Sequence, residues 1–299
     1  MKKRTNAGKG FSQEYDFKKP AQFKEVVRRF RKNRTAMVGF CIFTIILLLV
    51  LCADLIVDYD MGISTNIRAK LQGPSAQHWF GTDDLGRDIL ARVLHGGRIS
   101  LFLGFCTTIA SAVMGCLFGC VAGYYGNRVD DLIMRFMDIF SAIPTILMAI
   151  AVVAALGNSI PNLILALSIA RVPAFTRIVR SAVLSVGNQE YIEASKAGGA
   201  YDARILVQHI LPNCIGPIIV QTTMNMAIII LQAASLSFLG LGINPPTPEW
   251  GAIISSARSF LRTSPHIMLF PGLFLVLSSL SISLFGDGLR DALDPRLKS

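Results

Sequence analysis

The feature that most constrains this chain is a set of five long apolar stretches that contain no Asp, Glu, Lys or Arg. The hydrocarbon core of a bilayer is about 30 Å thick, and a helix needs about 20 apolar residues to cross it. Because only 16% of all residues are charged, the chain also lacks the polar surface of a soluble domain. These stretches predict an integral membrane protein, and they cover residues 35–53, 99–127, 139–170, 214–248 and 263–286.

One of these stretches is too long for a single helix. Residues 139–170 contain the turn-forming sequence GNSIP at 157–161, which predicts a hairpin between two spans. Since a backbone in lipid must satisfy its own hydrogen bonds, each span is expected to be an α-helix. The predicted fold class is therefore an all-α integral membrane protein with six transmembrane helices, over about 35–56, 99–123, 134–156, 161–180, 213–237 and 265–286.

The distribution of Lys and Arg predicts the orientation, because basic residues are retained on the cytoplasmic side of a membrane. Twelve of the 29 basic residues precede Thr35; with that end inside, 22 lie in cytoplasmic segments and seven outside. Both termini are therefore expected in the cytoplasm. The net charge of +10 follows the membrane flanks and no nucleic-acid-binding motif accompanies it, so the expected partner is anionic lipid and not nucleic acid.

Apolar residues before the first span recur at helical spacing. Phe23, Val26, Val27 and Phe30 share one face of a helix, while Lys and Arg occupy other directions. This pattern is typical of an interfacial helix that lies in the membrane surface. A solvated basic tail is the alternative.

Small residues in the second span, at Ser111, Gly115, Gly119 and Gly123, repeat every four positions. In lipid, such a stripe allows two helix backbones to approach closely and gain van der Waals contact. We interpret it as a structural seam, either to another helix of this chain or to a partner subunit.

One basic side chain falls near the middle of a predicted span. Arg171 follows Pro161 by ten residues, which is about 15 Å along a helix and close to the bilayer midplane. An Arg at that depth costs about 2.5–3.5 kcal/mol or more, and it usually faces a cavity or a partner. It either lines the substrate pathway and attracts a carboxylate, or reaches the cytoplasmic surface from a shifted helix.

The fifth span is apolar except for one face. Gln221, Asn225, Gln232 and Ser235 lie within about 80° of one another on a helical projection. We favour a hydrated path along this face, and hydrogen bonding to neighbouring helices is the alternative. Asp138 in the third span is expected to pair with Arg135 or with a basic residue of another segment, without a transport role.

The sequence carries no motif for catalysis. It lacks the phosphate loop GxxxxGK[ST], a Ser-His-Asp arrangement and the HExxH zinc motif. The six cysteines lie in or beside apolar helices without metal-ligand spacing. We therefore predict that the chain is not an enzyme and binds no metal or cofactor.

Between the fourth and fifth spans, YIEASKAGGA at 191–200 is followed, after eight residues, by HILPN at 209–213. From Glu193 to Pro212 this segment resembles, in full register, the EAA loop of ABC importer permeases. Ser195 replaces the second Ala of that pattern, and His209 stands where the general pattern has Ile. The flanking residues are similar to the peptide-transporter version of the loop.

Three further segments resemble signatures of dipeptide, oligopeptide and nickel permeases of the second-permease type: FGTDDLGRD at 80–88, PPTPEWG at 245–251 and GDGLRDALDP at 286–295. The resemblance covers about 20–299 and implies the type I ABC importer permease fold. It implies a basic N-terminal segment at 1–34, a first helix and outer loop at 35–98, a five-helix core at 99–286 with a coupling loop at 188–213, and a C-terminal tail at 287–299.

The resemblance also implies a transporter in a bacterial cytoplasmic membrane. Its other parts would be a homologous second permease, two ATPase subunits that use ATP and Mg, and an extracytoplasmic substrate-binding protein. The coupling loop would dock on one ATPase and drive alternating access. Glu193 would make a polar contact there, Gly199 would form the turn, and close packing would involve the small residues Ala194, Ser195 and Ala200.

For the substrate, the resemblance favours dipeptides or oligopeptides, which suit Arg171. Nickel or metal-chelate complexes and glutathione-like peptides are the alternatives within the family. A secondary transporter or channel is the alternative outside it. That class predicts inverted repeats or many intramembrane charges, which the sequence does not display.

Overall fold

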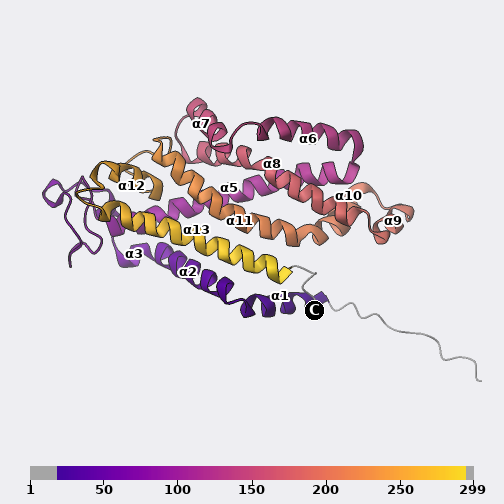
Figure 1. Cartoon of the computed structure of the whole chain (residues 1–299), viewed down its shortest axis with the longest axis horizontal. Helices are drawn as coiled ribbons and strands as arrows, with labels where there is room; N and C mark the ends of the chain where they lie inside the picture. Colours follow the sequence, from indigo (N-terminus) through magenta and orange to yellow (C-terminus); the bar gives the residue numbers. More distant parts are fainter. Residues whose placement is uncertain (1–18, 294–299) are drawn as a thin grey trace, which may run out of the picture.

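The computed structural model describes residues 19–293, with side chains from Glu25 onward, and in this range the chain is a bundle of helices without β-strands. The long helices lie side by side along the longest axis (Figure 1). The predicted all-α fold is confirmed. The predictions for residues 1–18, for the side chain of Phe23 and for the last six residues of the tail lie outside the described residues.

Five of the described helices are long and apolar enough to cross a membrane, and a bent helix pair can supply a sixth span. Three start or end well beyond their predicted limits, since α5 begins ten residues before the expected start and α8 and α13 each run seven residues past the expected end. The five are α2 (Arg34–Leu51), α5 (Ile89–Tyr125), α8 (Ile160–Gly187), α11 (Leu211–Phe238) and α13 (His266–Leu293).

The third span differs from the prediction of one straight helix. It consists of α6 (Asn127–Ser141) and α7 (Thr145–Leu156), which meet at an angle of 82°. Pro144 lies in the break with an extended backbone, at φ −52° and ψ 131°. Proline has no N–H for a helical hydrogen bond and disfavours the helical conformation in the residue before it, so the helix ends there.

Short helices occupy the two ends of the bundle. Figure 1 shows α3 and α12 toward one end and α9 and α10 at the other. The bounds of these and the remaining helices are α1 (Lys19–Lys32), α3 (Ala53–Ile56), α4 (Tyr59–Ile63), η1 (Ile67–Ala69), α9 (Glu190–Ala197), α10 (Asp202–Arg204), the π-helix η2 (Ile205–Ile210), α12 (Trp250–Ala257) and η3 (Arg258–Phe260).

The stripe of small residues on α5 packs against α8 of the same chain. A Cβ atom built on Gly115 would lie 2.3 Å from the Cβ of Phe175, and one on Gly119 would lie 2.7 Å from the Cβ of Val179. Real Cβ atoms do not approach so closely, which means that the glycines permit the contact. The seam predicted from sequence is therefore internal to the chain.

The beginning and end of the described chain also meet. The ring of Phe30 in α1 stands edge-on to that of Phe285 in α13, with 5.3 Å between ring centroids. Asn33, just after α1, donates a hydrogen bond from Nδ2 to Oδ2 of Asp291 over 3.2 Å. The helix predicted before the first span is therefore present and packs on α13.

The loop between α4 and α5 folds around one buried carboxylate. Asp83 accepts hydrogen bonds at Oδ1 from the backbone N–H groups of Leu85 and Arg87, each over 2.9 Å. Its Oδ2 pairs with Nε of Arg87 at 2.7 Å and with the guanidinium of Arg92 in α5. The loop is thereby fixed to the first turns of α5.

A second buried carboxylate anchors the loop between α11 and α12. Glu249 caps α12 by accepting from the N–H groups of Gly251 and Ala252, and it also accepts from Oγ of Ser100 in α5 over 3.0 Å. Trp250, fully buried, donates from Nε1 to the carbonyl oxygen of Val93 over 2.8 Å. Both loops therefore attach to the same end of α5.

We predict that Gly119→Ala lowers the free energy of unfolding by about 1–3 kcal/mol, because the added methyl group overpacks the seam between α5 and α8. Gly272→Ala in α13 is the control, since its Cβ would meet no atom within 4 Å. Thermal unfolding of the detergent-solubilised protein measures both. Equal melting temperatures for the two variants would contradict the close packing of α5 against α8 at Gly119.

Asp83→Asn is expected to lower the free energy of unfolding by about 3–5 kcal/mol, because it leaves buried Arg92 without its counter-charge. Burial favours the neutral acid, but the charges of Arg92 and Arg87 and two backbone N–H groups outweigh it, so the pKa of Asp83 lies below its ordinary value of 3.8. Stabilisation from a depressed pKa is complete above the ordinary value and is lost as the pH falls through the folded-state value.

Unfolding followed by the fluorescence of Trp79 and Trp250, the two tryptophans of the chain, tests this prediction. Asp84→Asn is the matched control, because the Asp84 side chain makes no hydrogen bond or ion pair within the described residues. Wild type should lose stability below pH 3.8 more steeply than Asp83→Asn. Parallel pH curves would refute the role of this carboxylate.

Candidate functional site

The loop between α8 and α11 has the predicted shape of a helix, a turn and a second helix. α9 ends at Ala197, and Gly199 turns the chain with φ of 79°, a conformation that residues with a Cβ rarely adopt. The second helix starts as α10 and continues as the six-residue π-helix η2 into α11. Sequence periodicity did not distinguish this π-helix from an ordinary α-helix.

One face of the loop is buried against the bundle. Ile192, Ile205 and Ile210 are completely buried, and they pack in one apolar cluster with Val179 and Val183 of α8. The loop is therefore not a loose connection, because its displacement would pull on α8 and α11.

The opposite face of the loop is open. Glu193, Ala194 and Gly199 are exposed, while Ser195 and Ala200 are half-buried and joined by the N–H of Ala200, which donates to the carbonyl oxygen of Ser195 over 3.2 Å. The structure thus places three of the five predicted coupling residues on the free surface and two in the turn behind it.

Sequence reasoning missed three exposed apolar side chains in the same loop as Glu193. Tyr191 is 43% exposed, Tyr201 68% and Val207 64%. Exposed aromatic and branched side chains at the end of a bundle are typical of a surface that another protein covers. The signal in the sequence that could have found them was their spacing from Glu193 in the two helices of the loop.

A polar contact joins this loop to α5 as well. The hydroxyl of Tyr124 donates to Oδ1 of Asp202 over 2.7 Å, and Nζ of Lys196 lies 4.9 Å from the centre of the Tyr124 ring. Both helices of the loop therefore contact the last turn of α5.

The structure brings Arg171 and Gln232 together. Nε of Arg171 in α8 donates to Oε1 of Gln232 in α11 over 3.0 Å, and both side chains are half-buried. Because Gln232 is neutral, the guanidinium keeps its positive charge uncompensated by this partner. The pair is a fixed cationic point between two long helices.

The other polar residues of α11 do not join this pair. Asn225 is 2% exposed and donates from Nδ2 to the carbonyl oxygen of Gln221 in its own helix, over 2.9 Å. Ser235 donates to the carbonyl oxygen of Leu231 over 2.8 Å. Gln221 is half-buried and lies eleven residues from Gln232, about 16 Å along the helix.

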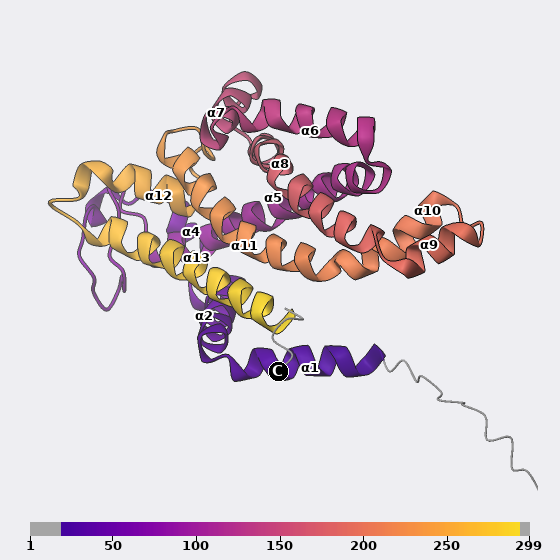
Figure 2. The same ribbon diagram turned by 45° about the vertical axis from the view of Figure 1, so that its right-hand side comes forward.

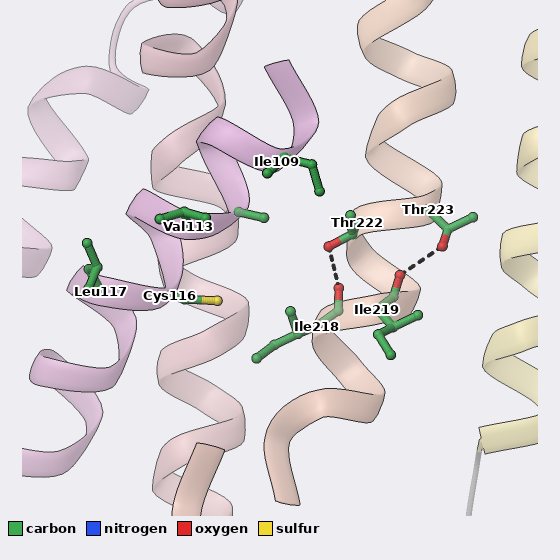
Figure 3. Close-up of a pocket in the computed structure, with 9 residues that line it drawn as sticks. Ile109, Val113, Cys116, Leu117, Ile218, Ile219, Thr222 and Thr223 are labelled. Carbon is green, nitrogen blue, oxygen red and sulfur yellow. Dashed lines mark hydrogen bonds between the residues drawn. The ribbon is translucent and has the colours of Figure 1, made fainter. Parts of the chain in front are cut away.

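A groove between α5 and α11 has apolar walls. Figure 3 shows Ile109 and Cys116 of α5 pointing toward α11, which carries Ile218. The hollow between the two helices has a volume of about 460 Å³. The hydroxyl of Thr222 points back to the carbonyl oxygen of Ile218 over 2.7 Å, and so offers its hydrogen to its own helix. A charged substrate would find no ionic partner among the residues that line this groove.

Two families of known proteins match this chain. Residues 115–299 match the family described as binding-protein-dependent transport system inner membrane component. Residues 21–74 match the N-terminal TM domain of oligopeptide transport permease C. The two matches together include α1 to α4 and the whole segment from α6 to α13.

Similar proteins include the dipeptide transport system permease protein DppC of Alkalihalophilus pseudofirmus, 47% identical over 93% of this chain and 91% of that protein. The di/tripeptide transport system permease protein DppC of Pseudomonas aeruginosa is 42% identical over 94% of each chain. The glutathione transport system permease protein GsiD of Escherichia coli is 46% identical over 92% of this chain and 90% of its own length.

A solved structure of the MetNI methionine ABC transporter in an inward-facing conformation has a chain with a TM-score of 0.57. It covers 68% of this chain and 96% of its own, at 19% identity. This likeness concerns the fold alone, and it agrees with the predicted type I importer permease architecture.

Proposed function

Because this chain belongs to the family of binding-protein-dependent transport system inner membrane components, we propose that it forms half of an ATP-driven translocation pathway for dipeptides and oligopeptides. It is a multi-pass permease of a bacterial ABC importer. The prediction of a permease of the dipeptide and oligopeptide family is confirmed, as against a secondary transporter or channel.

The observation that carries the mechanism is the two-sided loop around Glu193. Its buried isoleucines join it to α8 and α11, while Glu193 and Tyr201 face outward. We propose that an ATPase subunit binds this outer face, and that closure of the ATPases moves the loop together with the two helices. Because Arg171 and Gln232 lie in these helices, the motion would change the access to them.

Peptides are the substrate class that the chemistry of α8 supports. A peptide carries a carboxylate, and the guanidinium of Arg171 is a bidentate donor for such a group. The DppC and GsiD proteins are named for transport of dipeptides, di/tripeptides and glutathione, which all share that carboxylate. Arg171 is therefore proposed to hold the carboxylate during passage, with Gln232 orienting the guanidinium.

The remaining parts of the transporter belong to the proposal. We expect a second, homologous permease, two ATPase subunits that use ATP and Mg, and an extracytoplasmic substrate-binding protein. The coupling loop and the described chain ends would face the cytoplasm, and the two loops anchored by Asp83 and Glu249 would face outward. The basic segment before α2 agrees with this orientation.

We predict that Glu193→Arg abolishes uptake and uncouples ATP hydrolysis from transport, because it reverses a charge at the proposed ATPase contact. Peptide uptake and ATPase activity of the reconstituted transporter measure the effect. Asp287→Arg is the control, since Asp287 is likewise exposed, at the end of α13. Wild-type uptake by Glu193→Arg would exclude the coupling role.

Replacing Arg171 by Ala should reduce uptake at least tenfold, since it removes the cationic donor from the pathway. Arg262→Ala, at an exposed position before α13, is expected to transport normally. Initial uptake rates at several peptide concentrations separate a loss of apparent affinity from a loss of maximal rate. Unchanged kinetics in Arg171→Ala would reject a contact with substrate.

A further inference from the structure

One face of α6 is an apolar seam that the described part of the chain leaves uncovered. Val129, Leu132, Phe136 and Ile139 of α6, together with Ile143 just after its end, are separated by alternating steps of three and four residues, and each is 40–74% exposed. Steps of three and four are the spacing of the a and d positions of a heptad, with which one helix packs along another. The seam therefore has the geometry of a helix-binding surface.

The opposite face fixes α6 to its own chain. Asp130 forms an ion pair with Arg180 of α8, and Asp138 accepts a hydrogen bond at Oδ1 from Nη2 of Arg177 over 2.8 Å. Met137, which lies between Asp130 and Asp138 in the sequence, is buried, with an exposure of 2%. Figures 1 and 2 both show α6 at the rim of the bundle, and the ion pairs orient its seam outward.

Two arginines flank this seam. With Val129 and Phe136 at a positions, Arg128 and Arg135 occupy the g positions, which face the partner helix in a coiled coil. Both are exposed, and within the described residues neither forms an ion pair. A lipid-facing helix could place Arg128 at the headgroups, but Arg135 lies seven residues further on, about 10 Å along the helix.

We propose that the α6 seam packs in parallel against a helix of the second, homologous permease, and that this helix carries Asp or Glu opposite Arg128 and Arg135. The inference rests on the proposed function, which includes that second permease. Two related subunits around an axis normal to the membrane pair equivalent helices in parallel. In a parallel pair, each g position faces an e position of the other helix.

A second copy of this chain does not meet that requirement. The e positions of α6 are Ile133 and Phe140, so two identical α6 helices would place each arginine beside an apolar side chain. A partner with carboxylates at these positions pairs both charges. The seam therefore selects a different subunit and disfavours a homodimer.

The test is copurification of the second permease with the tagged chain from membranes in which all subunits are coexpressed. Arg135→Glu and Leu132→Ser should each lower the recovery of that permease at least tenfold. Arg68→Glu, at an exposed outer position, and Leu132→Met, which keeps the apolar group, should leave it unchanged. A monodisperse elution peak of the tagged variants shows that they fold, since both residues project from the bundle.

Each outcome of this test assigns a different role or partner to the seam. Full recovery of the second permease with every variant overturns the inference, and altered uptake in that case would place the seam in the pathway. Recovery of two differently tagged copies of this chain, with loss of that pairing in Arg135→Glu, overturns it in favour of a homodimer. If the wild-type chain recovers neither a permease nor ATPases, the proposed function itself fails.

Discussion

The structure depends on the close approach of α5 and α8. In a bilayer the hydrophobic effect gives two helices little reason to associate, so they are held by van der Waals contact that only small residues permit. Gly115 and Gly119 allow α8 to lie against the α5 backbone, with Phe175 and Val179 filling the space of the missing side chains. These contacts fix α8 on α5 over the turns from Phe175 to Val183.

Three parts of the proposed mechanism attach to α8. Its middle carries Arg171, which is oriented toward α11 by Gln232. Its later turns supply Arg180, which holds α6, and Val183, which contacts the apolar face of the coupling loop. A movement imposed on the loop would therefore be transmitted to one helix that also positions Arg171, the proposed pathway residue, and α6.

The two loops at one end of α5 are held by buried carboxylates, whereas the long helices α5 and α8 are held by close packing. Asp83 and Glu249 are both fully buried, and each satisfies several N–H or O–H donors at once. A buried carboxylate is tolerated only when it is paired in this way, which makes such a network intolerant of a missing partner. The two loops anchored by Asp83 and Glu249 are thereby fixed to α5, whereas the loop around Glu193 keeps one exposed face, which is the face proposed to bind an ATPase subunit.

The sequence by itself determined the features that depend on local pattern: the membrane class, the number of spans and the place of the loop around Glu193. It also located the glycine stripe at Gly119, but not the helix that fills it. Apolar length and helical period are properties of a single segment, and a motif such as EAA is read without knowledge of its neighbours.

Tertiary structure alone decided the pairings. The sequence left open whether Arg171 meets a partner, and only the packing of α8 on α11 placed Gln232 within hydrogen-bond distance. Asp138 had two possible kinds of partner, and the fold assigned it to Arg177. Pro144 explains why the helix breaks after α6, but the direction of the bend was known only once the structure had placed α7. These contacts join residues far apart in the chain, and local periodicity carries no information about which distant surfaces meet.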